Sequence, residues 1–286
     1  DRKQVEAFGL KRQGDKLVTP ARDVDGKIWS LQYIPSDPGQ IKLFEKGGQK
    51  TGNFHVLGDL NTSDIVLVGE GYATCASLHM ATGLPVVEVF DSSNIAPVLT
   101  ALASRLAGQA KLICGDDDAL TPERVLKTLN KTVSADHAQS KLQVAEVTAA
   151  ELVVDGKARA LVCNPNCFMT LEYKNSPEGV QRLVGEFYNE ETKQRVPVLV
   201  NNVGREKALA VANTHKASTV FPVFASLDGG PSDFNDLQVR EGLDTVRQQL
   251  APAIQRARDA NRTPEQVARS ALGADAVVVQ PKVPAA

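Results

Sequence analysis

Residues 64–72 read Asp-Ile-Val-Leu-Val-Gly-Glu-Gly-Tyr, and residues 110–118 read Ala-Lys-Leu-Ile-Cys-Gly-Asp-Asp-Asp. In both stretches a short, uninterrupted apolar run ends in a glycine that acidic residues follow. Such runs are typical of strands that are buried on both faces, as in a parallel sheet. Between them, Ala73, Ala76 and Met80 recur at helical spacing. The two stretches therefore predict an α/β fold in which helices connect parallel strands.

The same alternation continues on either side of a long interruption. Residues 85–90 form another apolar run, 95–106 have helical spacing, and a helix at 205–215 followed by a strand at 220–224 is expected later. We expect residues 61–118 and 201–250 to form one core, a parallel sheet with flanking helices.

Three other segments flank or interrupt this core. Residues 1–60 predict a small antiparallel sheet, because turn-forming residues separate short apolar segments at 17–21, 28–34, 41–44 and 54–57. Residues 119–200 predict an α+β insertion, with a helix from Thr121 to about residue 129 and strands at 141–147, 151–154, 158–162, 171–173 and 196–200. The range 251–286 is expected to hold C-terminal helices and a tail, with one helix over 239–257 and a second starting at Thr263.

Bulk composition limits the classes of protein to consider. The chain has 286 residues with 42% hydrophobic residues and a formal net charge of −2. No apolar stretch reaches the roughly 18 residues that a membrane helix needs. The first residue is not Met, which indicates a fragment or a processed chain, and no apolar segment of a secretory signal follows it. Four scattered cysteines do not predict a disulfide framework, so a cytoplasmic location is expected.

Acidic residues follow several of the predicted strands. Glu70 follows the first core strand, and Asp116 and Asp118 follow the third. Alternation of side chains along an extended segment puts Asp116 and Asp118 on the same side, where they repel each other without a cation. Asp233 and Asp236 come after the late strand and reach the same edge if that strand joins the sheet. Carboxylate ligands of this kind suit Mg²⁺ or Mn²⁺. Each cluster alone is equally typical of a loop after a strand.

Together, these motifs resemble the TOPRIM domain. Val68-Gly69-Glu70-Gly71-Tyr72 is similar to its first motif, Cys114-Gly115-Asp116-Asp117-Asp118 to its Asp-x-Asp motif, and Asp233-Phe234-Asn235-Asp236 to its last acidic motif. Residues 202–208 look like its Gly- and Ala-rich helix. The combination is most similar to primases of the plasmid conjugative-transfer and satellite-phage type. The resemblance covers roughly residues 17–118 and 201–250. It departs from the family pattern at 119–200, which intervene where the family passes directly to the helix.

The resemblance implies a nucleotidyltransferase, a DNA primase core that makes short primers from nucleoside triphosphates on single-stranded DNA. Glu70, Asp116 and Asp118 would be catalytic and would bind Mg²⁺ or Mn²⁺, with Asp233 and Asp236 as further ligands. Candidate contacts to nucleotide or DNA are Lys46, Lys50, Arg22, Arg205 and Lys207. Single-stranded DNA, nucleoside triphosphates and replication or transfer proteins are the expected partners, and a membrane is not.

Two other functions use the same residues. A TOPRIM nuclease would cut a phosphodiester with these carboxylates, and a non-catalytic TOPRIM module of a mobile-element protein would bind DNA or a partner. Cys163 and Cys167 have loose spacing for zinc and are interpreted as a turn with two thiols. Trp29 and Tyr33 lie at alternate positions of one predicted strand, on the same face as Leu31. They are expected in the core rather than as a platform on which bases stack.

Overall fold

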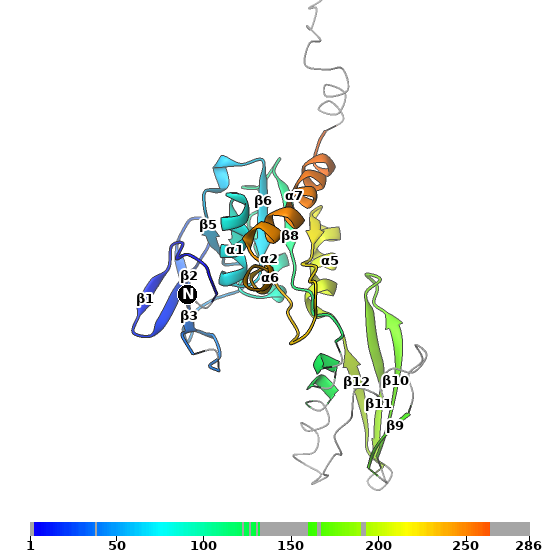
Figure 1. Cartoon of the computed structure of the whole chain (residues 1–286). Helices are drawn as coiled ribbons and strands as arrows, with labels where there is room; N and C mark the ends of the chain where they lie inside the picture. The colour runs from blue at the N-terminus through cyan, green and yellow to red at the C-terminus, as the bar shows by residue number, and fades with distance from the viewer. Residues whose placement is uncertain are drawn as a thin grey trace, which may run out of the picture.

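The computed structural model describes residues 3–37, 39–121, 123–125, 127–129, 131, 160–164, 167–189 and 193–263. Three separate sheets organise this part of the chain (Figure 1). The largest has five strands, and two antiparallel sheets have four strands each. The architecture is a mixed α/β fold.

The central sheet has the strand order β13-β8-β6-β7-β5. Four of its strands are parallel: β6 (Ile65–Gly69), β7 (Val86–Glu88), β8 (Ala110–Cys114) and β13 (Ser218–Val220). All of β6 and β7 is buried, in agreement with their apolar sequences. The fifth strand, β5 (His55–Leu57), runs antiparallel to β7. The prediction that 54–57 belongs to the small N-terminal sheet is therefore wrong, and the core sheet is mixed rather than wholly parallel. A three-residue strand carries too little pattern to fix its partner.

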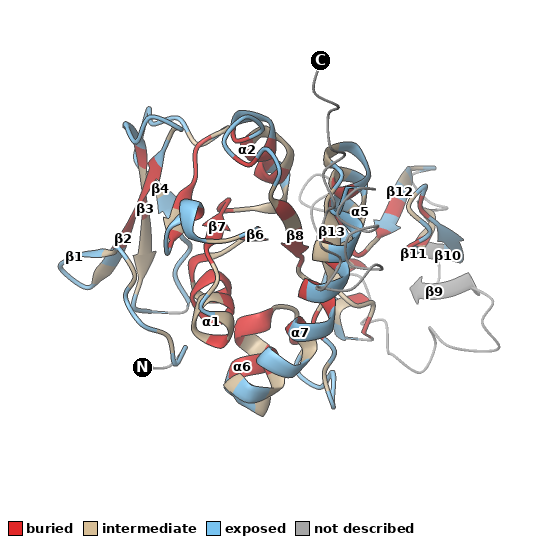
Figure 2. Ribbon diagram, turned by 90° about the horizontal axis from the view of Figure 1, so that it is seen from above, coloured by how far each residue is buried: buried red, intermediate tan, exposed pale blue. Residues whose placement is uncertain are grey.

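Helices cover both faces of this sheet (Figure 2). One face packs against α1 (Tyr72–Thr82), α6 (Phe234–Glu241) and α7 (Leu243–Ala260). The other face packs against α2 (Ile95–Ala101) and α5 (Val203–His215). Two short 3₁₀ helices, η1 (Leu60–Thr62) and η2 (Ser92–Asn94), lie in the connections. Parallel strands buried between helices on both faces are what the apolar runs predict.

The single helix expected over 239–257 is two helices. Gly242 separates α6 from α7. Its backbone has φ +91° and ψ 161°, a conformation that residues other than glycine rarely adopt. The apolar positions of α7 continue the helical spacing across this break, which is why the pattern alone does not show it. The helix expected from Thr263 lies outside the described residues.

The small N-terminal sheet contains β1 (Lys11–Gln13), β2 (Lys16–Arg22), β3 (Ile28–Pro35) and β4 (Leu43–Phe44), all antiparallel in that order. A backbone bridge between Arg22 and Phe54 links it to the segment that leads into β5. The prediction that Trp29 lies in the core is wrong, because 40% of its surface is exposed. Its indole nitrogen donates to Asp23 over 2.6 Å, and Lys27 covers its ring.

The third sheet lies within the predicted insertion and has the order β12-β11-β10-β9. Its strands are β9 (Ala160–Asn164), β10 (Cys167–Asn175), β11 (Gln181–Asn189) and β12 (Arg195–Val200). Figure 1 shows it projecting away from the central sheet. Leu183, Phe187 and Val198 are buried on one of its faces. The strands expected at 141–147 and 151–154 lie outside the described residues, as do the side chains of Cys163 and Cys167. No described helix is long and apolar enough to span a membrane.

Candidate functional site

Three carboxylates follow three neighbouring strands at the carboxyl edge of the central sheet. Glu70 comes directly after β6, Asp91 shortly after β7, and Asp116 after β8. The charges of Asp91 and Asp118 raise the pKa of Glu70, and the charge of Glu70 raises the pKa of Asp116. The four carboxylates therefore lie close together. The structure therefore brings Glu70, Asp116 and Asp118 to one edge of the sheet, as expected from their positions after the strands.

Glu70 and Asp116 are largely buried members of the cluster. Burial, followed by the negative charge of Asp118, raises the pKa of Glu70 to about 7. Burial and the charge of Glu70 raise the pKa of Asp116 to about 9. Glu70 Oε1 and Asp116 Oδ1 are buried without a hydrogen-bond partner. Buried acceptors normally have partners, so these two oxygens indicate a site that is complete only with a bound cation or proton.

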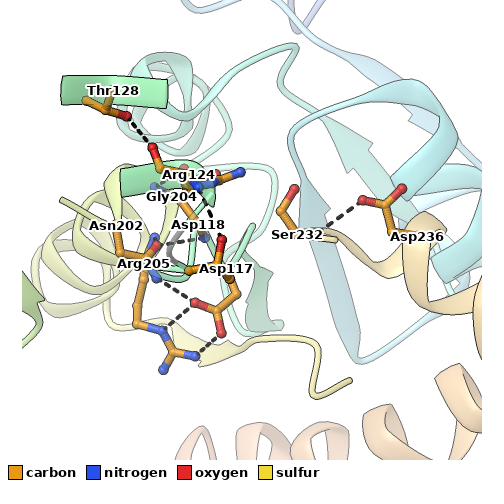
Figure 3. Close-up of polar contacts among 10 residues, drawn as sticks. Asp117, Asp118, Arg124, Thr128, Asn202, Gly204, Arg205, Ser232 and Asp236 are labelled. Atoms are coloured by element: carbon orange, nitrogen blue, oxygen red, sulfur yellow. Dashed lines mark hydrogen bonds and ion pairs between the residues drawn. The ribbon is translucent and has the colours of Figure 1, made fainter. Parts of the chain in front are cut away.

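The next two residues of the acidic turn are held by α5 and by the helical segment that follows the turn (Figure 3). Arg205 donates from Nε and Nη2 to the two oxygens of Asp117, over 3.2 and 2.6 Å. Asp118 forms an ion pair with Arg124, and its second oxygen accepts the Gly204 backbone N–H over 3.1 Å. The Asn202 side-chain oxygen Oδ1 accepts the Asp118 N–H over 2.9 Å. Asp117 therefore points to α5, away from the buried pair, as the alternation along the turn predicts.

Asp233 and Asp236 complete the acidic edge from the start of α6. Asp233 caps this helix by accepting the Asp236 N–H over 2.7 Å, and it interacts with the Thr74 hydroxyl. Burial and the Asp236 charge raise the pKa of Asp233. Asp236 accepts the Ser232 N–H over 3.1 Å and pairs with Lys3. Both carboxylates lie near Asp116, because their charges raise its pKa.

Two glycines let backbone segments approach the acidic turn. A Cβ at Gly204 would lie 2.5 Å from the Asp116 carbonyl oxygen. A Cβ at Gly115 would lie 2.7 Å from the Phe221 ring and 3.0 Å from the Ala208 Cβ. Any side chain at these positions would displace α5 from the turn, since real Cβ atoms do not approach other atoms so closely.

The proposed basic contacts are not equivalent. Lys50 pairs with Asp91, and Lys207 lies near Glu70 and lowers its pKa, so both border the acidic cluster. Arg205 is engaged with Asp117 and stacks over the Phe221 ring at 4.2 Å. Lys46 is exposed. Arg22 donates to the Gly26 carbonyl in the turn between β2 and β3. The structure thus places Lys50 and Lys207 at the site and uses Arg205 to hold the acidic turn.

The chain is similar to DNA primases over part of its length. It is 41% identical over 119 residues to a protein named DNA primase TraC from Escherichia coli, a match that covers 40% of this chain and 11% of that protein. A second Escherichia coli protein of the same name is 38% identical over 110 residues, covering 37% of this chain and 8% of its own length. The matched part is therefore related in sequence to primases, although the chain spans only about a tenth of the length of these relatives.

The comparison with solved structures gives a weaker match. A DnaG primase catalytic domain solved with single-stranded DNA matches 44% of this chain and 46% of its own, at 15% identity and a TM-score of 0.29. That score is below the level at which two folds count as the same. No protein-family model matches the chain.

Sequence patterns missed two residues of the site. Asp91 follows the apolar run 85–90 directly, so the rule that found Glu70 and Asp116 could have found it too. Arg124 carries no such signal, because its pairing with Asp118 depends on how the inserted segment folds back.

The carboxylate oxygens of the cluster are suitable ligands for a hard divalent cation. Glu70 and Asp116 offer unpartnered carboxylate oxygens, and Mg²⁺ and Mn²⁺ prefer oxygen ligands. Among the described residues, no three His, Cys, Asp or Glu side chains are already arranged to hold one metal ion. Arg124 pairs with an oxygen of Asp118, the next carboxylate of the acidic turn.

Proposed function

We propose that this chain carries the catalytic core of a DNA primase, which makes short primers from nucleoside triphosphates on single-stranded DNA with Mg²⁺ or Mn²⁺. The observation that carries the proposal is the pair of buried, unpartnered oxygens on Glu70 and Asp116 at the edge of the central sheet. The sequence identity with proteins named DNA primase TraC supports the same activity.

Glu70 and Asp116 would hold the metal ion, with Asp118 joining them and Asp233 and Asp236 further out. Divalent ions, when bound, stabilise the attacking and leaving oxygens of phosphoryl transfer. The fold buries one oxygen of Glu70 and one of Asp116 and gathers negative charge around them, which a cation or a proton compensates. In the alternative role, Glu70 would not bind the metal ion and would act as the general base that accepts a proton from the attacking hydroxyl. Lys207 at the rim is placed to attract phosphates, whereas Lys50 beside it is paired with Asp91.

The test is incubation of the full chain with single-stranded DNA, nucleoside triphosphates and Mg²⁺, followed by separation of the products. We expect short new oligonucleotides and an intact template. A shortened template without new oligonucleotides would instead identify a nuclease. Binding of DNA without either product would identify a non-catalytic module.

A further inference from the structure

Four carboxylates in and beside the acidic cluster are each paired with a basic side chain. The ion pairs come from four different parts of the chain: Lys3–Asp236, Lys50–Asp91, Arg205–Asp117 and Arg124–Asp118. Three further carboxylates of the cluster, Glu70, Asp116 and Asp233, have no ion pair in the described part of the chain. An incoming metal ion would therefore find Glu70 and Asp116 without ion-pair partners. To bind one of the four paired carboxylates it would have to compete with a basic side chain.

Asp118 is the rim carboxylate for which this competition matters most. Its charge acts on both Glu70 and Asp116, so it lies near both, whereas Asp91 acts on Glu70. Both of its oxygens have a partner, because one is paired with Arg124 and the other accepts the Gly204 N–H. The Gly204 bond uses one lone pair and orients the carboxylate, whereas the positive charge of Arg124 beside Asp118 repels a second cation. A metal ion therefore binds Asp118 more favourably once Arg124 has moved away.

Arg124 is held in the inserted segment by its backbone and not by its side chain. Its N–H donates to the Thr121 hydroxyl over 3.3 Å. Its carbonyl accepts from the Thr128 hydroxyl over 2.9 Å, as Figure 3 shows. The guanidinium reaches from this short helical segment to the acidic turn, and the Arg124 side chain is 28% exposed. An arginine fixed at its backbone and partly open to solvent at its head can change partners without unfolding the segment.

We propose that Arg124 is a nucleotide-binding residue that leaves Asp118 when a divalent metal ion binds and then pairs with the phosphates of the nucleoside triphosphate. This inference rests on the proposed function and assigns a role in it to the inserted segment. Metal binding removes the anion that Arg124 neutralises, and a metal-bound triphosphate brings another anion to the same place. A guanidinium matches phosphate geometry with two parallel N–H groups, which a lysine cannot do.

The first measurement is Mn²⁺ binding by calorimetry, without nucleotide, on the full chain. We expect the Arg124→Gln variant to bind Mn²⁺ about three- to tenfold more tightly than the unaltered protein, since a partly exposed ion pair no longer competes. Arg195→Gln is the matched control, because Arg195 pairs with Glu186 in the same insertion but away from the cluster, and its Mn²⁺ affinity should not change. Equal Mn²⁺ affinity of Arg124→Gln and the unaltered protein would overturn the partner exchange.

The second measurement is the affinity for a non-cleavable nucleoside triphosphate in excess Mg²⁺. We expect Arg124→Gln to lose about tenfold or more, since a charge-assisted bond to phosphate is removed. Arg124→Lys should keep an affinity for Mn²⁺ near that of the unaltered protein and recover part of the nucleotide affinity. Unchanged nucleotide binding by Arg124→Gln would refute the role in binding phosphates. Failure of the unaltered protein to bind Mn²⁺ at all would instead contradict the proposed function, which distinguishes the two failures.

Discussion

At the scale of single residues, the proposed site consists of a few carboxylates that follow strands. Sequence patterns identified Glu70 and Asp116 because an acid after a buried parallel strand is forced to the sheet edge. They could not show that one oxygen of Glu70 and one of Asp116 would be buried without a hydrogen-bond partner while Asp118 is paired with Arg124. That division depends on side chains from segments far apart in the sequence.

The first prediction concerns metal dependence. Mg²⁺ or Mn²⁺ should raise the melting temperature of the protein, because a ligand that binds only the folded state stabilises it. Asp116→Asn together with Asp118→Asn should remove that gain and leave the metal-free protein as stable or slightly more stable, since repulsion is relieved. Primer synthesis should be lost in the same variant. Asp244→Asn, an exposed carboxylate on α7, is the control and should keep the metal effect. A double variant that retains the full metal-dependent gain would place the ions elsewhere.

The second prediction concerns pH in the absence of metal. The pKa values of Glu70 and Asp116 are raised, to about 7 and about 9, so the folded state binds more protons than the unfolded state above pH ~4. Their contribution to stability is therefore fully present below their ordinary pKa values and is lost as pH rises toward 9. Thermal unfolding in a metal chelator should show a melting temperature that falls between pH 5 and pH 9. Asp116→Asn should flatten this slope, and an equally steep slope in the variant would refute the assignment.

At the scale of elements, the alternation of strands and helices was predictable where runs are long and apolar. The strands β6 and β8 and the helices α1 and α5 lie where their sequences place them. The direction of β5 was not predictable, because a three-residue strand is positioned by the partner it meets and not by its own pattern. The break at Gly242 was hidden by apolar spacing that continues from one helix into the next.

The third prediction tests whether the insertion is a separate unit. The strands β9 to β12 contact one another and make few contacts with elements of the core. Removing residues 119–200 and joining Asp118 to Asn201 by a short flexible linker should leave a folded protein, because the central sheet keeps both of its helical layers. Circular dichroism and a cooperative thermal transition are the measurements. An unfolded product would show that the insertion is integral to the core.

At the scale of the whole molecule, charge is uneven although the total is close to neutral. The formal net charge is −2, yet residues 1–57 contain ten lysines and arginines against seven aspartates and glutamates. The acidic edge of the central sheet is bordered by Lys3 and Lys50 from this N-terminal part. A metal-loaded acidic edge beside a basic border is an arrangement in which a polyanionic strand can lie across the site, since the ions remove the repulsion that the carboxylates would exert on phosphates.

The last prediction follows from this distribution and concerns binding of single-stranded DNA. Binding should weaken as salt rises, and the slope of log affinity against log salt should fall by about 0.7 for each phosphate contact removed. Lys46→Gln with Lys50→Gln should lower both affinity and slope, with the larger share from the exposed Lys46, because Lys50 is already neutralised by Asp91. Lys111→Gln removes the same charge near the amino end of β8, away from the site, and should change little. Fluorescence anisotropy at several salt concentrations is the measurement. Equal slopes in the double variant and in Lys111→Gln would show that the DNA follows another surface.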